Sequence, residues 1–138
     1  MLSEQKTKRV LVIEDEAPIR ERMVRILAYE GYETRGAQNG LAGVSIAHDF
    51  RPDVILCDAM MSDGDGFEAL AMLRQHLDTE TIPIIFVSAA TERASIRQAM
   101  EGGADDYITK PFTTEELVGA IEAQLKKRAA LLRRFKEG

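Results

Sequence analysis

Cysteine and histidine are scarce in this chain, and their scarcity excludes several kinds of site. The single cysteine, Cys57, excludes an internal disulfide and a zinc cluster built from thiolates. The two histidines, His48 and His76, are not spaced as metal ligands. Cys57 lies inside an apolar run, so we interpret it as a small core residue.

Long apolar runs are also missing. No run approaches the roughly 20 residues that a membrane-spanning helix needs, and residues 1–8 form a polar tail without the apolar core of a secretory signal. We therefore expect a cytoplasmic protein that does not use a membrane as a partner.

An excess of positive charge is lacking as well. The net charge of −5 argues against direct binding of nucleic acid by the main body of the chain. Basic residues gather only near the end of the sequence, at Lys126, Lys127, Arg128, Arg133, Arg134 and Lys136. A solvated helix face and an anion-binding patch both fit this cluster.

Two common phosphate and calcium motifs are absent. No glycine-rich loop ends in Gly-Lys-Ser or Gly-Lys-Thr, so we do not expect nucleotide hydrolysis of the P-loop type. The acidic residues Asp63 and Asp65 resemble part of a calcium loop. However, Met61 and Met72 occupy the positions of its first and last ligands.

Short apolar runs are what the chain does contain. Four of them, at residues 10–13, 54–57, 84–87 and, more weakly, 107–109, are continuous enough to be strands buried on both faces. A more polar strand at residues 32–37 suits a sheet edge, and amphipathic helices separate the strands. We expect an α/β fold, a (βα)5 doubly wound parallel sheet with the flavodoxin-like order 2-1-3-4-5.

The last helix begins clearly but continues too far. Thr113 and Glu116 form a capping box at its start, and an apolar seam then continues through Val118, Ile121, Leu125, Leu132 and Phe135, interrupted by Arg128. We expect a domain over residues 9–125 and a basic helical extension or linker over 126–138. A connector to an output domain outside this chain, a dimerisation helix and a solvated tail all remain open.

Polar side chains follow the buried strands, and their placement predicts a site. Asp15, Asp58, Ser88 and Lys110 each stand at the end of a different apolar run. Ligands bind beyond the carboxyl ends of parallel strands, so these four should converge. Taken singly, each is an ordinary turn or surface residue. It is their joint placement that favours a shared anion or metal site.

The chemistry of this group points to Mg²⁺ and phosphoryl transfer. Two carboxylates about 4 Å apart repel by roughly 4 kcal/mol at an effective dielectric of 20, which a divalent cation removes. Oxygen-only donors select Mg²⁺, and Glu14 joins Asp15 and Asp58 either directly or through water. A carboxylate can accept a phosphoryl group, with Ser88 donating to its oxygens and Lys110 neutralising its charge.

At these residues the chain resembles the receiver domain of two-component response regulators, of which the chemotaxis regulators are examples. The resemblance covers residues 9–125. Its four motifs are VLVIEDE at 10–16, DAMMSDGDGFE at 58–68, VSAA at 87–90 and GADDYITKPF at 103–112. Glu14 stands where aspartate is commoner. Ser62 stands where proline is usual, which suggests a more mobile loop.

The resemblance implies specific roles for these residues. Asp58 is the phosphoacceptor, and Glu14, Asp15, Asp58 and the main-chain carbonyl of Met60 hold Mg²⁺. Lys110 pairs with the phosphoryl group, and a cis Lys110–Pro111 bond directs the lysine side chain inward.

The same resemblance implies a switch. Ser88 and Ala89 belong to the segment that contacts the phosphoryl group, and Tyr107 moves when Ser88 does, which alters the surface around the fourth strand, fourth helix and fifth strand. Met60 and Ala90 cannot hold a water by hydrogen bonding, so we expect slow loss of the phosphoryl group.

Three functions compete at this point. The first is a switch, not an enzyme, phosphorylated on Asp58 by a sensor histidine kinase or histidine phosphotransfer protein, with a homodimer through the fourth-helix face or the last helix as one outcome. The second is a non-phosphorylated pseudo-receiver module for interaction or dimerisation. The third is a small Mg²⁺-dependent phosphatase or nucleotide-binding enzyme. The sequence does not identify the kinase, the signal or the output.

Overall fold

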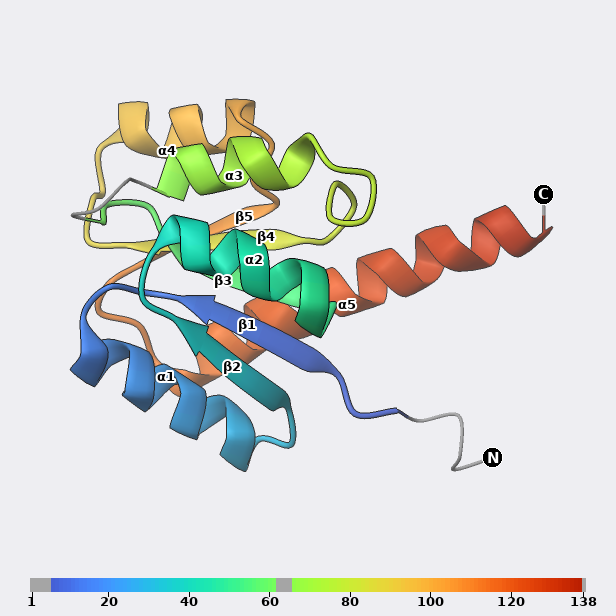
Figure 1. The fold of residues 1–138 in the computed structure, drawn as a ribbon, viewed down its shortest axis with the longest axis horizontal. Helices are drawn as coiled ribbons and strands as arrows, with labels where there is room; N and C mark the ends of the chain where they lie inside the picture. Colours follow the sequence, from blue (N-terminus) through green and yellow to red (C-terminus); the bar gives the residue numbers. More distant parts are fainter. Residues whose placement is uncertain (1–5, 62–65, 138) are drawn as a thin grey trace.

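The computed structural model describes residues 6–61 and 66–137, in which strands and helices alternate (Figure 1). The elements are β1 Arg9–Ile13, α1 Ala17–Tyr29, β2 Glu33–Ala37, α2 Gly40–Phe50, β3 Val54–Asp58, α3 Gly66–Arg74, β4 Ile84–Ser88, α4 Arg93–Glu101, β5 Asp106–Thr109 and α5 Thr114–Glu137.

The strands form one parallel sheet in the order β2-β1-β3-β4-β5, which confirms the predicted α/β topology. The central strands β3 and β4 are buried at every position, whereas the edge strand β2 is largely exposed. Ile13 of β1 lies opposite Cys57, and Asp58 of β3 lies opposite Val87. The carboxyl ends of the three central strands are therefore nearly level.

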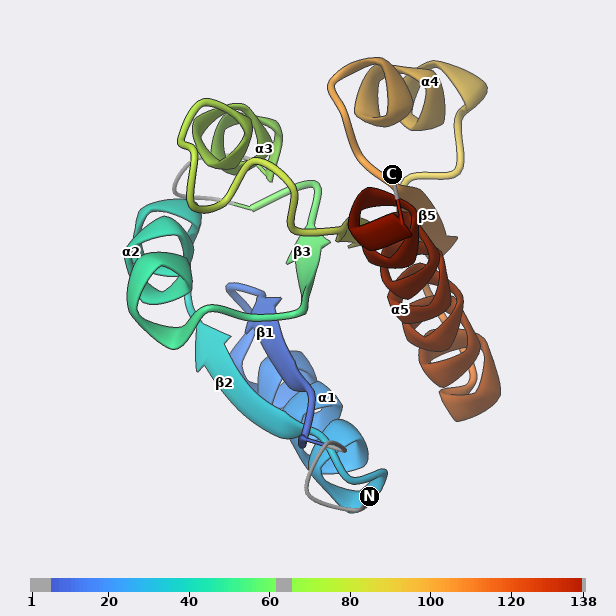
Figure 2. The ribbon, with the colours of Figure 1, turned by 90° about the vertical axis from the view of Figure 1, so that its right-hand side faces the viewer.

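Helices cover both faces of the sheet (Figure 2). Along β1, Leu11 and Ile13 join a cluster that includes residues of α2 and α3, while Val10 and Val12 join a cluster that includes residues of α1 and α5. Successive side chains of a strand point to opposite faces, so one short apolar run supplies both cores.

Local signals in the sequence fix where several helices begin. The Asn39 side chain accepts a hydrogen bond from the Ala42 N–H (2.8 Å) at the start of α2. At the start of α5, the Thr113 N–H donates to Glu116 (2.8 Å) and the Glu116 N–H donates to the Thr113 hydroxyl (3.0 Å). The predicted capping box is thus present, and it satisfies amides that have no partner inside the helix.

The last helix, α5, extends beyond the body of the domain (Figure 1). Ile121 is fully buried, and Arg128 donates to the Asp53 carbonyl (3.4 Å) near the start of β3. Beyond that contact the apolar seam is open, with Leu132 54% and Phe135 82% exposed. The helix is continuous across residue 125, so the division into residues 9–125 and 126–138 stays a prediction.

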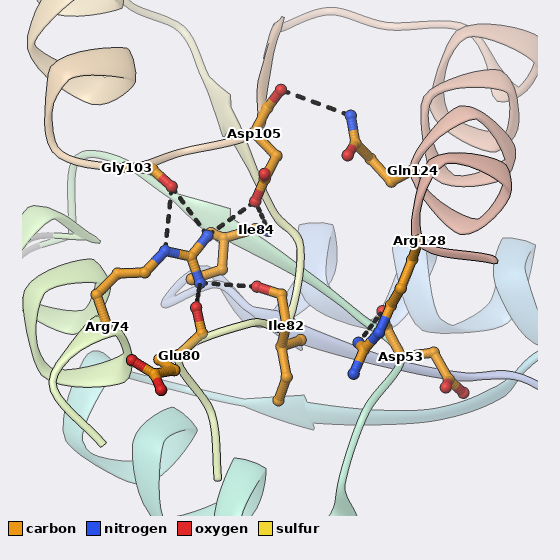
Figure 3. A network of polar contacts seen from close by, with 9 residues as sticks. All are labelled: Asp53, Arg74, Glu80, Ile82, Ile84, Gly103, Asp105, Gln124 and Arg128. Carbon is orange, nitrogen blue, oxygen red and sulfur yellow. Dashed lines mark hydrogen bonds and ion pairs between the residues drawn. The ribbon is translucent and has the colours of Figure 1, made fainter. Parts of the chain in front are cut away.

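A polar network ties the amino ends of β4 and β5 to α3 (Figure 3). The Arg74 guanidinium donates to the carboxylate of Asp105 (2.8 Å) and twice to the Gly103 carbonyl (3.1 and 2.9 Å). It also reaches the carbonyls of Glu80 (3.1 Å) and Ile82 (2.8 Å). Asp105 in turn accepts from the N–H of Ile84 (2.8 Å), and its carbonyl accepts from Gln124 of α5 (3.5 Å).

Membrane insertion finds no support in the helices. Within the described residues, none combines the length and the apolar character that crossing a bilayer requires.

Candidate functional site

Three carboxylates converge beyond the carboxyl ends of β1 and β3. Glu14, Asp15 and Asp58 each offer an oxygen, and these oxygens lie within 4.8 Å of one another. The parallel register brings them together, because β1 and β3 are neighbours in the sheet. The convergence predicted for Asp15 and Asp58 is therefore present, and Glu14 is part of it.

Glu14 is almost completely buried, with 1% of its surface exposed. One carboxylate oxygen, Oε1, accepts a hydrogen bond from Lys110 Nζ at 2.8 Å, and the other accepts from the Glu16 N–H at 3.2 Å. Burial raises the pKa of Glu14 above its ordinary value of 4.5, although the hydrogen bond from Lys110 opposes that shift. Sequence reasoning placed this residue but did not anticipate its ion pair with the lysine.

Lys110 reaches the centre of the site from the end of β5. Its ammonium lies 2.8 Å from Glu14 and 3.5 Å from Oδ2 of Asp58, and its main-chain N–H donates to the Ser88 carbonyl (2.8 Å). Burial favours the neutral amine, but the hydrogen bond to Glu14 and the charge of Asp58 outweigh it and raise the pKa of Lys110. The Lys110–Pro111 bond is cis, as the resemblance implied.

Asp58 ends β3 with 6% of its surface exposed. Its Oδ1 accepts a hydrogen bond from the Met60 N–H at 3.1 Å, while the Met60 side chain is 64% exposed. Gly66, at the start of α3, lies so close that a Cβ there would come 2.3 Å from the Asp58 carbonyl oxygen. Gly66 is therefore a structural requirement of the site, whereas in the sequence it is only one residue of the motif at 58–68.

Ser88 and Tyr107 meet at a third residue, Ala90. The buried Ser88 hydroxyl accepts from the Ala90 N–H (3.2 Å), and the half-buried Tyr107 donates its hydroxyl to the Ala90 carbonyl (2.9 Å). The loop from β4 to α4 is thus held by both side chains, and Ala89 lies exposed between them.

Two predictions cannot be followed into the structure. The mobility expected at Ser62 concerns a residue outside the described ranges, and no observation bears on the Met60 carbonyl as a ligand. That ligand stays a prediction.

The donor set suits Mg²⁺. Carboxylate oxygens are the ligands this hard ion prefers. The three carboxylate oxygens lie within 4.8 Å of one another, so a divalent cation would relieve their mutual repulsion. Glu14, Asp15 and Asp58 are the residues that could hold it.

Comparisons with known proteins agree with this geometry. A family model described as "Response regulator receiver domain" matches residues 10–122. The chain is 41% identical over 120 residues to the phosphate regulon transcriptional regulatory protein PhoB of Pseudomonas aeruginosa, which covers 87% of this chain and 52% of that protein. It is 32% identical to the DNA-binding response regulator MtrA of Mycobacterium leprae over the same shares of each chain.

Solved structures show the same fold. The chemotaxis protein CheY4 of Vibrio cholerae matches with a TM-score of 0.83 and 28% identity, covering 87% of this chain and 100% of that chain. A response regulator receiver domain protein from Methanospirillum hungatei matches with a TM-score of 0.84 and 26% identity, covering 96% of this chain and 100% of that chain.

The chain spans about half the length of the curated relatives it matches, so the comparison concerns one domain of those proteins. The family model nevertheless covers most of the sequence, and its fold and acidic site are those described above. The chain therefore belongs to the family of response regulator receiver domains of two-component systems.

Proposed function

We propose that Asp58 accepts a phosphoryl group from a sensor histidine kinase or a histidine phosphotransfer protein. The observation that carries the proposal is the convergence of Glu14, Asp15 and Asp58 with the ammonium of Lys110. In the transfer, an oxygen of Asp58 forms a bond to phosphorus as the bond from phosphorus to the donor's histidine nitrogen breaks. The histidine leaves neutral after taking up a proton.

The groups around Asp58 would have two roles in the transfer, holding the metal ion and neutralising the phosphoryl charge. Mg²⁺, held by Glu14, Asp15, Asp58 and the Met60 carbonyl, would supply positive charge between the carboxylates and the phosphoryl oxygens. Lys110 stands 3.5 Å from Asp58, within reach of a group attached there, and supplies a second positive charge.

Ser88, Ala89 and Tyr107 would convert phosphorylation into a change of shape. A phosphoryl oxygen draws the Ser88 hydroxyl away from the Ala90 amide, and the loop that Ala90 shares with Tyr107 then rearranges. The surface formed by β4, α4 and β5 is the output of the switch. Because the chemistry ends on the protein itself, we propose a switch and not an enzyme.

A groove beside Lys110 suits the phosphodonor. It has a volume of about 500 Å³, lies between α1 and the segment that joins β5 to α5, and is lined by apolar side chains such as Ile19, Met23 and Phe112. The groove adjoins the lysine that would meet the phosphoryl group, so a donor helix placed there could present its phosphohistidine to Asp58.

The exposed seam of α5 supports a second contact. Leu131, Leu132 and Phe135 form an apolar stripe on a helix that has left the body of the domain. We propose that a second copy of this chain covers it, alone or together with the face formed by α4, β5 and α5. An output domain in a longer chain is the alternative occupant. Sedimentation with and without beryllofluoride separates these, since a monomer in both states contradicts the dimer.

The cellular setting is also part of the proposal. One relative is named a transcriptional regulatory protein and another a DNA-binding response regulator, and in both of them this domain corresponds to about half of the chain. We propose a cytoplasmic protein in which any contact with DNA belongs to another domain, because the net charge of −5 disfavours it here.

Acetyl phosphate tests the proposal directly. With Mg²⁺ we expect the protein to gain the mass of one phosphoryl group, and we expect the gain to be absent in Asp58→Asn and retained in Asp49→Asn, an exposed acid of α2. No gain in the wild-type protein would support the pseudo-receiver module. Turnover of acetyl phosphate without a trapped adduct would support the phosphatase.

A further inference from the structure

Glu14 is held at every polar group that it has. Its N–H donates to the Ala37 carbonyl (3.0 Å) and its carboxylate is bound by Lys110 and the Glu16 amide. Its carbonyl accepts from Nη1 of Arg20 at 2.7 Å. Among these partners, Arg20 is the side chain that belongs neither to the acidic segment nor to the set of groups expected to meet the phosphoryl group. It comes from α1.

The Arg20 side chain packs against Gly36 of the edge strand β2, and its guanidinium reaches the Glu14 carbonyl from there. A Cβ on Gly36 would lie 3.0 Å from Cδ and 3.1 Å from Cγ of Arg20, closer than the 3.5–4.0 Å at which carbon atoms attract. Glycine is unfavourable inside a strand, and it often marks a place where another group must approach closely. Gly36 is such a place, because it leaves room for the arginine.

The contact links the acid pair to the frame of the domain. Glu14 and Asp15 lie in the short turn between β1 and α1, and the Arg20 N–H donates to the Glu16 carbonyl (2.9 Å) as α1 begins. Arg20 therefore binds both sides of this turn, through its backbone at Glu16 and its guanidinium at Glu14. Because the guanidinium is planar and pre-organised, it loses little conformational entropy when it forms this hydrogen bond.

We infer that Arg20, admitted by Gly36, is a positioning residue for the divalent-cation site. It fixes the Glu14 carbonyl, so the Glu14 and Asp15 carboxylates stay converged on Asp58. The inference rests on the proposed Mg²⁺ site and adds to it a contact outside the ligands. Such outer contacts typically change metal affinity by 10- to 100-fold when removed.

A purely electrostatic role predicts the opposite sign. Arg20 carries a positive charge at the main chain of Glu14, one of the expected ligands, so losing that charge alone would strengthen Mg²⁺ binding. Positioning predicts weaker binding. The direction of the change therefore separates the two roles without reference to phosphorylation.

The experiment is a calorimetric titration of the full chain with Mg²⁺. We expect Arg20→Met to weaken binding about tenfold and Arg20→Lys, which keeps the charge, to recover part of the loss. Gly36→Ala should weaken binding severalfold by displacing the arginine, although it changes no charge and no ligand. Arg25→Met removes an exposed arginine of the same helix and should leave the affinity unchanged or slightly tighter.

Amide spectra and urea unfolding without Mg²⁺ show whether each variant keeps the fold. If Arg20→Met does not fold, Gly36→Ala and Arg20→Lys test the inference in its place. Binding by a folded Arg20→Met or Gly36→Ala as tight as wild type overturns this inference alone. A wild-type protein that binds no Mg²⁺ at millimolar concentration overturns the proposed site together with it.

Discussion

The two ends of the sheet hold charged groups in opposite ways. At the amino end, the guanidinium of Arg74 meets Asp105 and a set of main-chain carbonyls, so each charge is paired and hydrogen-bonded (Figure 3). At the carboxyl end, the carboxylates of Glu14, Asp15 and Asp58 converge, and the ammonium of Lys110 pairs with Glu14 and Asp58. The first arrangement ties three elements of the fold together, and the second gathers carboxylate oxygens that a cation can bind.

With these two arrangements, one fold separates the residues that stabilise it from the residues of its functional site. A satisfied polar network costs little to keep and much to break. A cluster of like charges is tolerated because binding a cation relieves their mutual repulsion. Substitutions at the amino end should therefore act on folding, and substitutions at the carboxyl end should act on phosphorylation.

The largest effect is expected from Lys110→Met at the carboxyl end. Removing the ammonium that faces Asp58 should slow phosphorylation by acetyl phosphate roughly 10²- to 10³-fold, the usual result of losing one group that stabilises developing charge. The rate of mass gain measures it. Lys126→Met, an exposed lysine of α5, is the control and should behave as wild type. A phosphorylation rate of Lys110→Met within twofold of wild type would contradict the functional role assigned to the carboxyl end of the sheet.

At the amino end, Arg74→Ala should destabilise the domain by about 2–3 kcal/mol, because it leaves Asp105 and several carbonyls without their partner. Urea unfolding measures the change. Arg97→Ala, which breaks an exposed pair with Glu101 on α4, should change stability by less than about 0.5 kcal/mol. Equal effects of the two substitutions would show that the Arg74–Asp105 network stabilises the domain no more than the exposed Arg97–Glu101 pair does.

The stability of Lys110→Met should depend on pH in a definite direction. Burial raises the pKa of Glu14 above 4.5, so the stability this group contributes is complete below pH 4.5 and is lost as pH rises through the raised pKa. In wild type the lysine limits that loss. We expect the variant to be less stable than wild type at pH 7 and to approach it near pH 4.

Unfolding curves in the presence of EDTA measure this gap at the two pH values. A gap of constant size would show that Lys110 does not stabilise the ionised form of Glu14.

The smallest effect is expected at Met60, which is exposed beside Asp58 and offers no hydrogen bond to water from its side chain. Met60→Gln should speed loss of the phosphoryl group about tenfold, below the usual contribution of a group that positions a reacting water. The decay of the phosphorylated mass measures it. Decay of the wild-type phosphoprotein within seconds would contradict the expected slow loss.

Much of the fold follows from local patterns. The apolar runs at 10–13, 54–57 and 84–87 became β1, β3 and β4, and the capping box at Thr113 starts α5 as expected. These signals depend on neighbours in the sequence, which is why they can be interpreted without coordinates. The seam of α5 was also visible, but its division at Arg128 into a buried and an exposed part depends on where the sheet ends.

Part of the site escaped the sequence. Arg20 resembles any polar residue of an amphipathic helix, and Gly36 resembles a weak point in an edge strand. Each acquires a role only through the other, because the arginine crosses the strand where a side chain is missing. Gly66 is similar, since its closeness to Asp58 depends on how the loop returns to α3.

The apolar runs alone place Asp15, Asp58, Ser88 and Lys110 at strand ends, and the parallel order places these four residues at one edge of the sheet. Which of these groups pair with one another depends on the folded arrangement. Lys110 lies closer to Glu14, at 2.8 Å, than to Asp58, at 3.5 Å. The reason is physical: strand periodicity is a property of adjacent residues, whereas ion pairs depend on the reach of side chains between elements far apart in the sequence.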